Sequence, residues 1–180
     1  MKKILLLFGL CLSLSFQTFA QENKTEGKII KDFGLPFSVE NPDIKTDITA
    51  EHKVIFDVSQ SSDDNSTVNK YIVTAARFLN MHASAGMKPK QLHVAMTIHG
   101  GAWKDVMTNE AYKEKYGVDN PNLELINQLS EAGVDIILCG QSAGARGLNK
   151  TNVNPQVKFA LSAMTALLQY QNNGYRFIKF

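Results

Sequence analysis

Cys139 stands directly after a run of apolar residues and directly before a glycine-rich turn. The run covers residues 134–138, and the turn reads Gly140-Gln-Ser-Ala-Gly144. Short apolar runs bounded by turn signals predict buried strands of a parallel sheet, and such sheets bind ligands outside the carboxyl ends of their strands. Because the thiolate form of cysteine is a nucleophile, this arrangement predicts thiol chemistry at Cys139.

The residues that follow Cys139 favour a reactive thiolate. The turn Gly140-Gln141-Ser142 can aim successive backbone N–H groups back at the sulfur, and such backbone nests favour negative charge. Arg146 is close enough in sequence to add a positive charge. We therefore predict that Gly140, Gln141, Ser142 and Arg146 stabilise or bind the thiolate. The alternatives are an inert buried thiol at Cys139 and an ordinary solvated side chain at Arg146.

His99 is the second candidate for a catalytic role. It follows the apolar run 92–98 and precedes two glycines. If the strands that end at His99 and Cys139 are neighbours, the imidazole ends beside the thiol and could act as a base or an ion-pair partner. The alternative is a histidine that only holds its glycine-rich loop.

Two further patterns suggest a serine hydrolase, but the order of residues along the chain argues against one. Residues 140–144 match the Gly-x-Ser-x-Gly nucleophile elbow, and residues 99–103 resemble the oxyanion loop of lipases and esterases. In that fold the catalytic histidine follows the serine, whereas the four histidines here all precede Ser142: His52, His82, His93 and His99. A serine without its base is a weak nucleophile. We therefore predict that the protein is not a serine hydrolase.

Neither a metal nor a nucleotide cofactor is predicted. Cys139 is the one cysteine after residue 20, and together with the scattered histidines it offers no short ligand spacing for a metal. The glycines at 140, 144 and 147 lack the Gly-x-Gly start of a dinucleotide fingerprint.

The first 20 residues predict a cleavable signal peptide. Lys2 and Lys3 precede an apolar run over residues 4–16, and Thr18-Phe-Ala20 places small residues three and one before a cut. We expect cleavage after Ala20, export to the periplasm and no stable membrane insertion afterwards. The chain carries 19 basic and 17 acidic residues, so without Lys2 and Lys3 it is neutral and gives no reason to expect nucleic acid as a partner.

The elements that must position Cys139 alternate between strand and helix. Residues 21–51 are polar and aperiodic, which predicts an extended arm laid on the domain or on a partner. Five strands and four helices are predicted after the arm, with a polar, aromatic-bearing excursion over 103–117. The strands cover 53–58, 92–98, 134–139, 157–161 and 175–180. Three helices cover 67–82, 120–132 and 162–171, and residues 141–150 hold only a short helix. Such alternation predicts an α/β domain with a parallel sheet and helices on both faces.

Three segments of this layout resemble the DsrE/DsrF-like family of small sulfur-handling proteins. They are the first strand with its acidic-polar loop, the stretch 134–140, and the closing stretch 157–178. The resemblance spans residues 52–180 and implies a three-layer α/β/α fold with a five-stranded parallel sheet of order 4-3-2-1-5. It also implies a homo-oligomer such as a trimer or hexamer. Cys139 matches the cysteine that accepts sulfur as a persulfide in the best-known members.

We therefore expect an exported sulfur-relay or sulfurtransferase-like protein that carries a persulfide on Cys139. Its partners would be a sulfur donor and an acceptor, either proteins or small sulfur compounds. The best-known members act in the cytoplasm, so export and the added arm put the usual relay partners in doubt. The alternative is a non-catalytic oligomeric module that binds a small ligand or a protein in the same strand-end crevice.

Overall fold

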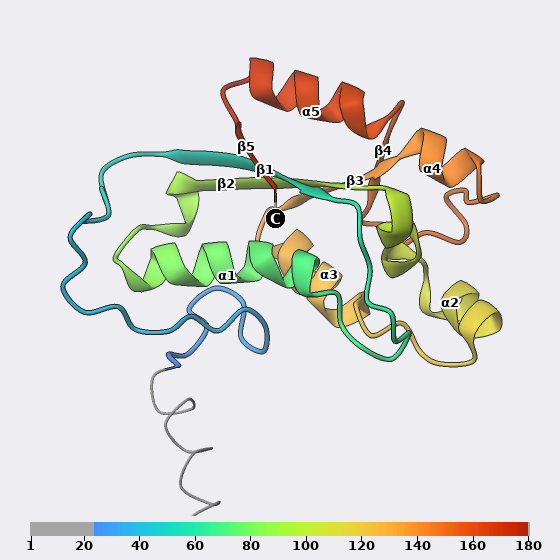
Figure 1. Ribbon diagram of the computed structural model, residues 1–180, viewed down its shortest axis with the longest axis horizontal. Coiled ribbons are helices and arrows are strands. Elements are labelled where there is room, and N and C mark those ends of the chain that lie inside the picture. The colour runs from blue at the N-terminus through green and yellow to red at the C-terminus, as the bar shows by residue number, and fades with distance from the viewer. Residues whose placement is uncertain (1–23, 180) are drawn as a thin grey trace, which may run out of the picture.

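The computed structural model describes residues 24–179, and the predicted signal peptide with its cut after Ala20 lies outside them. Strands and helices alternate along the domain (Figure 1). The strands are β1 (His52–Val58), β2 (Leu92–Ile98), β3 (Asp135–Cys139), β4 (Lys158–Ala160) and β5 (Arg176–Ile178). The α-helices are α1 (Lys70–Ser84), α2 (Asn109–Tyr116), α3 (Leu123–Glu131), α4 (Gly140–Gly144) and α5 (Ala163–Asn172), and 3₁₀ helices cover Pro89–Gln91 and Gly100–Val106.

The five strands form one parallel sheet in the order β4-β3-β2-β1-β5. This order confirms the prediction that the family resemblance implied. The strands that end before His99 and at Cys139 are neighbours, with Ile98 paired to Leu138. All carboxyl ends of the strands therefore lie at one edge of the sheet.

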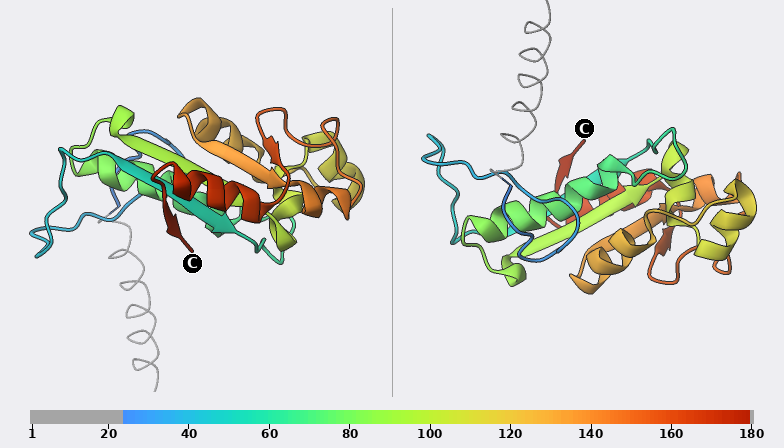
Figure 2. Two further views of the ribbon diagram at one scale, coloured as in Figure 1. Left: turned by 90° about the horizontal axis from the view of Figure 1, so that it is seen from above. Right: turned by 90° about the horizontal axis from the view of Figure 1, so that it is seen from below.

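Helices cover both faces of the sheet. Figures 1 and 2 show α1 and α3 on one face and α5 on the other. Alternate strand residues divide between two cores, so that Phe56 and Leu138 pack on the α1 side while Ile55 and Ile137 pack on the α5 side. This period of two is the geometry of an extended chain, and it decides which face each catalytic candidate reaches.

Helix α1 forms because its apolar residues recur at helical spacing. Ile72, Ala75, Ala76 and Leu79 are buried along one stripe. The side chain of Asn69 caps the first turn by accepting a hydrogen bond from the Tyr71 N–H at 2.8 Å. The helix was predicted over 67–82, and the cap places its start three residues later.

Two boundaries differ from the prediction. The excursion after Gly100 holds a 3₁₀ helix and the eight-residue α2, because Thr108 caps the latter and Gly117 ends it with φ 76°. Helix α3 begins at Leu123, three residues later than predicted, and the Asn120 side chain before it accepts the N–H of Asn122 at 2.9 Å. The short helix expected within 141–150 is α4, which covers Gly140–Gly144.

The arm before β1 lies along α1 without forming a helix or a named strand of its own. Ile30 is buried, and the fully buried side chain of Asn80 anchors its backbone. The Oδ1 atom of Asn80 accepts the N–H groups of Ile29 and Ile30, both at 2.9 Å. Its Nδ2 atom donates to the carbonyls of Ile30 at 2.8 Å and Phe33 at 3.0 Å. The Nδ2 atom also donates to the Gly34 carbonyl at 3.4 Å, so one buried amide bonds to five backbone groups of the arm. Within residues 24–179 no helix has the length and apolar character needed to cross a membrane.

Candidate functional site

Cys139 ends β3 on the face of the sheet that α5 covers. Leu138 belongs to the core on the α1 side and Ile137 to the core on the α5 side, so the alternation of the strand turns Cys139 towards α5. The thiol is free and 6% exposed. The structure therefore sets the sulfur at the carboxyl edge of the sheet, between α4 and α5, with a narrow opening to solvent.

Hydrogen bonds around the sulfur lower the pKa of the Cys139 thiol. Burial by itself raises this pKa, but hydrogen bonds from the backbone of Ser142, Ala163 and Gln141 and from the Ser142 hydroxyl outweigh the burial. All four donors favour the charged form of the sulfur. Two of the three backbone donors lie in α4 and the third, Ala163, is the first residue of α5. The first N–H groups of a helix have no partner within the helix, and Gln141, Ser142 and Ala163 all stand in the first turns of helices that begin close to Cys139.

Gly140 allows the β4–α5 turn to approach the cysteine. A Cβ atom at this position would lie 2.6 Å from the Ala160 carbonyl oxygen and 3.1 Å from that of Leu161. The neighbouring Gln141 holds the same turn, because its Nε2 atom donates a hydrogen bond to the Leu161 carbonyl at 3.2 Å. The turn is thus held close to β3, and the N–H of Ala163 reaches the thiol as a consequence.

His99 lies beside Cys139 in the sheet, and its imidazole is bound by the strand on the other side. The Nε2 atom of His99 lies 2.7 Å from Oδ1 of Asp57 in β1. Asp57 is held in turn by Lys179, whose Nζ lies 2.9 Å from Oδ2, and by the Thr97 hydroxyl at 3.1 Å. Burial raises the pKa of Asp57, but its hydrogen bonds with Lys179, His99 and Thr97 bring the pKa below the ordinary value. Asp57 is therefore a carboxylate that orients His99.

Arg146 is engaged away from the thiol. Its guanidinium carbon lies 5.4 Å from the centre of the Trp103 ring, and its Nη1 atom donates to the Ser142 carbonyl at 3.3 Å. Arg146 is not among the residues whose hydrogen bonds lower the pKa of Cys139, so its role in stabilising the thiolate stays a prediction. Its place over Trp103 follows from the long 3₁₀ segment Gly100–Val106, which the sequence did not reveal.

An exposed apolar rim borders the site. Leu161 is 73% exposed in the turn before α5, and Met164 and Leu168 on α5 are 71% and 62% exposed. Residues 164 and 168 are one helical turn apart and so share a face of α5. Anything that approaches Cys139 past this turn meets an apolar surface.

Sequence reasoning missed two parts of this site, Ala163 and Asp57. A signal for the first was available, since Ser162 stands between a strand and a helix and caps α5 by accepting the Thr165 N–H at 3.0 Å. No local pattern marked Asp57, because its partners Thr97, His99 and Lys179 are 40 or more residues away in the chain. Among the described residues, no three His, Cys, Asp or Glu side chains gather in a group that could hold a metal ion.

Comparison with solved structures finds the same fold at low sequence identity. A protein of unknown function from Methanobacterium thermoautotrophicum, MTH1491, aligns with a TM-score of 0.52 and 15% identity over 72% of this chain and 100% of its own. The ychN protein from E. coli aligns with a TM-score of 0.53 and 14% identity over 72% of this chain and 99% of its own. Identities at this level support the fold alone.

Comparison with curated proteins finds no match. The model of the DsrE/DsrF-like family matches residues 52–180, which is the whole of the sheet and its helices. The five strands of the sheet, in the order β4-β3-β2-β1-β5, all fall within the matched residues. The chain belongs to the DsrE/DsrF-like family.

Proposed function

We propose that this protein is an exported sulfur carrier that accepts and donates sulfane sulfur through a persulfide on Cys139. Its family is one related to sulfur relay. The observation that carries the proposal is the place of the free Cys139 thiol at the carboxyl end of β3, where Gly140 lets the turn before α5 approach closely. Hydrogen bonds from Ser142, Ala163 and Gln141 outweigh burial there and lower the thiol pKa. A thiol with a lowered pKa has a larger fraction of the reactive thiolate form at neutral pH than an ordinary cysteine.

The proposed transfer runs in two balanced steps. The Cys139 thiolate attacks the outer sulfur of a persulfide or of thiosulfate, a new S–S bond forms, and the donor thiolate or sulfite leaves with the electron pair. An acceptor thiolate then attacks the outer sulfur on Cys139, and the Cys139 thiolate leaves. No external oxidant or reductant is consumed.

The donors at the sulfur suit both the resting and the loaded state. Hydrogen bonds from Ser142, Gln141 and Ala163 favour a negative charge on Sγ, and this atom is the leaving group of the second step. His99, held by Asp57 at 2.7 Å, is proposed to exchange a proton with the incoming or departing sulfur. Gly140, Gln141 and Ser142 are proposed to position these donors, and Arg146 to hold the outer end of α4 against Trp103.

The test is to incubate reduced protein with thiosulfate or a polysulfide and to measure the intact mass. We expect a gain of about 32 Da, the mass of one sulfur atom, on the peptide that contains Cys139 and none in Cys139→Ser. Serine preserves the shape of the site but stays protonated near neutral pH and cannot hold a persulfide. The same protein should show a native thiol that reacts rapidly with a thiol reagent at neutral pH.

One observation favours a second candidate function, a non-catalytic binding module. Cys139 is only 6% exposed, while Leu161, Met164 and Leu168 beside it form the exposed apolar rim described above. A module of this kind would use the crevice for contact with a ligand, a partner protein or further copies of the chain. A thiol that stays unreactive until the protein is denatured, with no sulfur adduct from any donor, would favour this second function. The trimer or hexamer implied by the family is also part of the proposal, and sedimentation of residues 21–180 at micromolar concentration would test it.

A further inference from the structure

Two cations share one aromatic ring at the carboxyl edge of the sheet. The guanidinium carbon of Arg146 lies 5.4 Å from the centre of the Trp103 ring, and the Lys115 ammonium lies 5.7 Å from the same centre. Trp103 belongs to the 3₁₀ helix after β2, Lys115 belongs to α2, and Arg146 follows α4. Figure 1 shows α2 and α4 at the same end of the sheet. Three segments that lie apart in the sequence thus gather two like charges at one side chain.

Neither of these cations has a carboxylate as its partner. Among residues 24–179 no ion pair includes Arg146 or Lys115, and both side chains are exposed. Lys113 on the same helix α2, by contrast, pairs with Asp119 at 3.0 Å. The face of an aromatic ring attracts a cation, but the ring carries no net charge and leaves the two like charges without a counter-ion. An anion bound by both would relieve their mutual repulsion.

A third cation nearby already has its hydrogen bonds satisfied. The Lys104 ammonium donates to the Ser62 carbonyl at 3.1 Å and to Oδ1 of Asn65 at 2.6 Å. It also lies 5.5 Å from the centre of the Tyr116 ring. The loop before α1 therefore holds Lys104 in place, whereas Arg146 and Lys115 remain available to a ligand.

The two available cations lie close to the reactive thiol. Ser142 bonds to the sulfur of Cys139 through its backbone N–H and its hydroxyl, and its carbonyl accepts a hydrogen bond from Nη1 of Arg146 at 3.3 Å. One residue thus separates the guanidinium from the sulfur, which is a distance of roughly 10 Å. A small molecule that reacts at Cys139 can span this distance.

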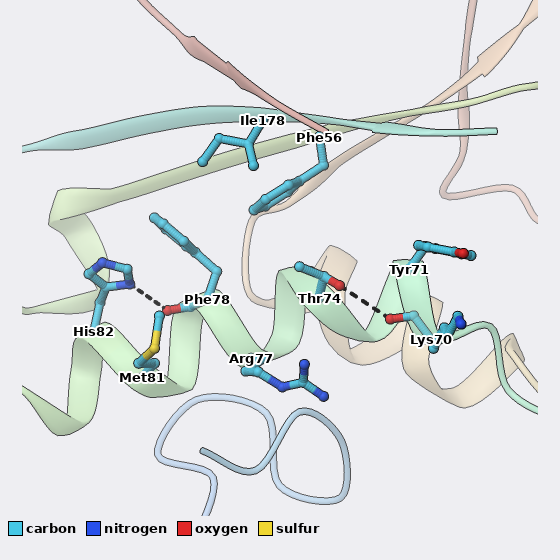
Figure 3. Close-up of a pocket in the computed structure, with 9 residues that line it drawn as sticks. All are labelled: Phe56, Lys70, Tyr71, Thr74, Arg77, Phe78, Met81, His82 and Ile178. Atoms are coloured by element: carbon cyan, nitrogen blue, oxygen red, sulfur yellow. Dashed lines mark hydrogen bonds between the residues drawn. The ribbon is translucent and has the colours of Figure 1, made fainter. Parts of the chain in front are cut away.

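The groove between α1 and β5, of about 680 Å³, also carries two cations, Lys70 and Arg77 (Figure 3). Phe56 in this groove is 2% exposed, and its ring meets the Phe78 ring edge-on with 5.9 Å between the centres. These rings cover one another, and the groove lies on the face of the sheet opposite to Cys139. For these reasons we place no ligand in this groove.

We propose that Arg146 and Lys115 bind the carboxylate of a small thiol that exchanges sulfur with Cys139. The carboxylate supplies the counter-ion that the two cations lack, and the planar guanidinium can hold its two oxygens with parallel hydrogen bonds. The inference rests on the proposed sulfur transfer and names the class of its small partner, which is a carboxylate-bearing thiol or its persulfide.

The first test compares two thiol reagents of similar size and opposite charge at low salt, the 2-sulfonatoethyl and 2-(trimethylammonio)ethyl methanethiosulfonates. The sulfonate stands in for the carboxylate, and mass analysis of the peptide that contains Cys139 gives each rate. We expect the ratio of the anionic to the cationic rate to fall about fivefold to tenfold in Lys115→Gln/Arg146→Gln. A change in the exposure or ionisation of the thiol affects both reagents alike and cancels in the ratio. Lys113→Gln removes a cation of α2 that is already paired and should leave the ratio unchanged.

Trp103 offers a second measurement that needs no reaction at the thiol. It is the one tryptophan of the chain, so its fluorescence reports on this cluster. The ligands are 3-(methylsulfanyl)propanoate and the matching amide, which has nearly the same shape and no charge. We expect the acid to bind at least about tenfold more tightly than the amide, and we expect the double variant to lose this preference.

The inference is overturned if the rate ratio is the same in the double variant and in the unchanged protein, or if acid and amide bind equally. A sulfur carrier without this anion site would still gain about 32 Da from a sulfur donor. A protein that selects anions at Cys139 but never gains sulfur would instead overturn the proposed sulfur transfer, while the binding of a carboxylate beside the thiol would stand.

Discussion

Asp57 in β1 holds the imidazole of His99 after β2, with 2.7 Å between Oδ1 and Nε2. The pairing of Ile98 with Leu138 sets His99 beside Cys139 in the sheet. Asp57, His99 and Cys139 therefore follow one another across three neighbouring strands, and the carboxylate fixes the orientation of the imidazole at the end of the middle strand.

We predict that Asp57→Asn and His99→Ala each slow sulfur transfer by about 10-fold to 100-fold. The double variant should be no slower than His99→Ala, because the carboxylate acts through the imidazole. The measurement is the rate of persulfide formation followed by mass. His93→Ala is the control, because His93 lies near the other end of β2, and this variant should transfer sulfur at the unchanged rate. Additive losses in the double variant would show that Asp57 does not act through His99.

Ser142→Ala should raise the pKa of the Cys139 thiol, because it removes the hydroxyl donor and keeps the backbone donor. At neutral pH the thiolate fraction falls, so alkylation by iodoacetamide should slow by about threefold to tenfold. The pH profile of alkylation gives the pKa directly and should move to higher pH. Ser130→Ala, in α3 on the other face of the sheet, should leave the profile in place. A profile that does not move in Ser142→Ala would contradict a role for this hydroxyl.

Gly140→Ala should destabilise the domain by about 1–3 kcal/mol, since the added methyl group meets the Ala160 carbonyl oxygen at 2.6 Å. The turn before α5 must then retreat, so the N–H of Ala163 moves away from the sulfur and the thiol pKa rises. Gly144→Ala is the matched control in the same short helix, where an added Cβ has no neighbour within 4 Å. It should be neutral or slightly stabilising. Equal effects of the two changes in urea unfolding would contradict the close approach at Gly140.

Asn80→Ala should release the arm from α1, because five backbone groups of residues 29–34 lose their partner. We expect a loss of about 2–4 kcal/mol in urea unfolding and faster proteolysis between residues 24 and 51. Asn172→Ala, at the end of α5, is the control and should be close to neutral. Unchanged proteolysis of the arm in Asn80→Ala would show that other contacts hold it.

Because of Asp105, the free energy of unfolding should fall as the pH rises from about 4 to about 6. Burial raises its pKa to about 6 from an ordinary value of 3.8, even though hydrogen bonds from Ser61 and Asn69 act against the rise. The folded protein then binds a proton that the unfolded chain has lost, so this contribution is complete below about pH 4 and disappears above about pH 6. The free energy of unfolding should differ by at most about 3 kcal/mol between the two ends of this pH range. Urea unfolding at several pH values gives the slope of the unfolding free energy against pH. This slope should be negative between about pH 4 and pH 6 and absent in Asp105→Asn. Equal slopes in both proteins would contradict a raised pKa of Asp105.

The order of the helices and strands and the position of Cys139 after a buried strand could be predicted from the sequence. The spacing of apolar residues indicates which side of a strand or helix is buried, and this spacing can be seen within a short stretch of the chain. For this reason β1, β2, β3 and α1 were predicted within a few residues, and Cys139 was predicted at the end of a buried strand. Elements whose limits depend on remote contacts were predicted less well. The edge strands β4 and β5 are three residues each because each pairs along one side only.

The surroundings of the Cys139 thiol depend on contacts between distant parts of the chain, and the sequence did not predict them. The backbone of Ala163 reaches Cys139 because Gly140 lets a distant turn approach. Asp57 meets His99 because β1 and β2 are neighbours in register. Arg146 turns to Trp103, although its sequence neighbours pointed to Cys139. Most of these contacts join residues that lie well apart in the chain, and the short helix α4 sets the direction of Arg146. A sequence pattern does not show which distant side chains a parallel sheet brings side by side.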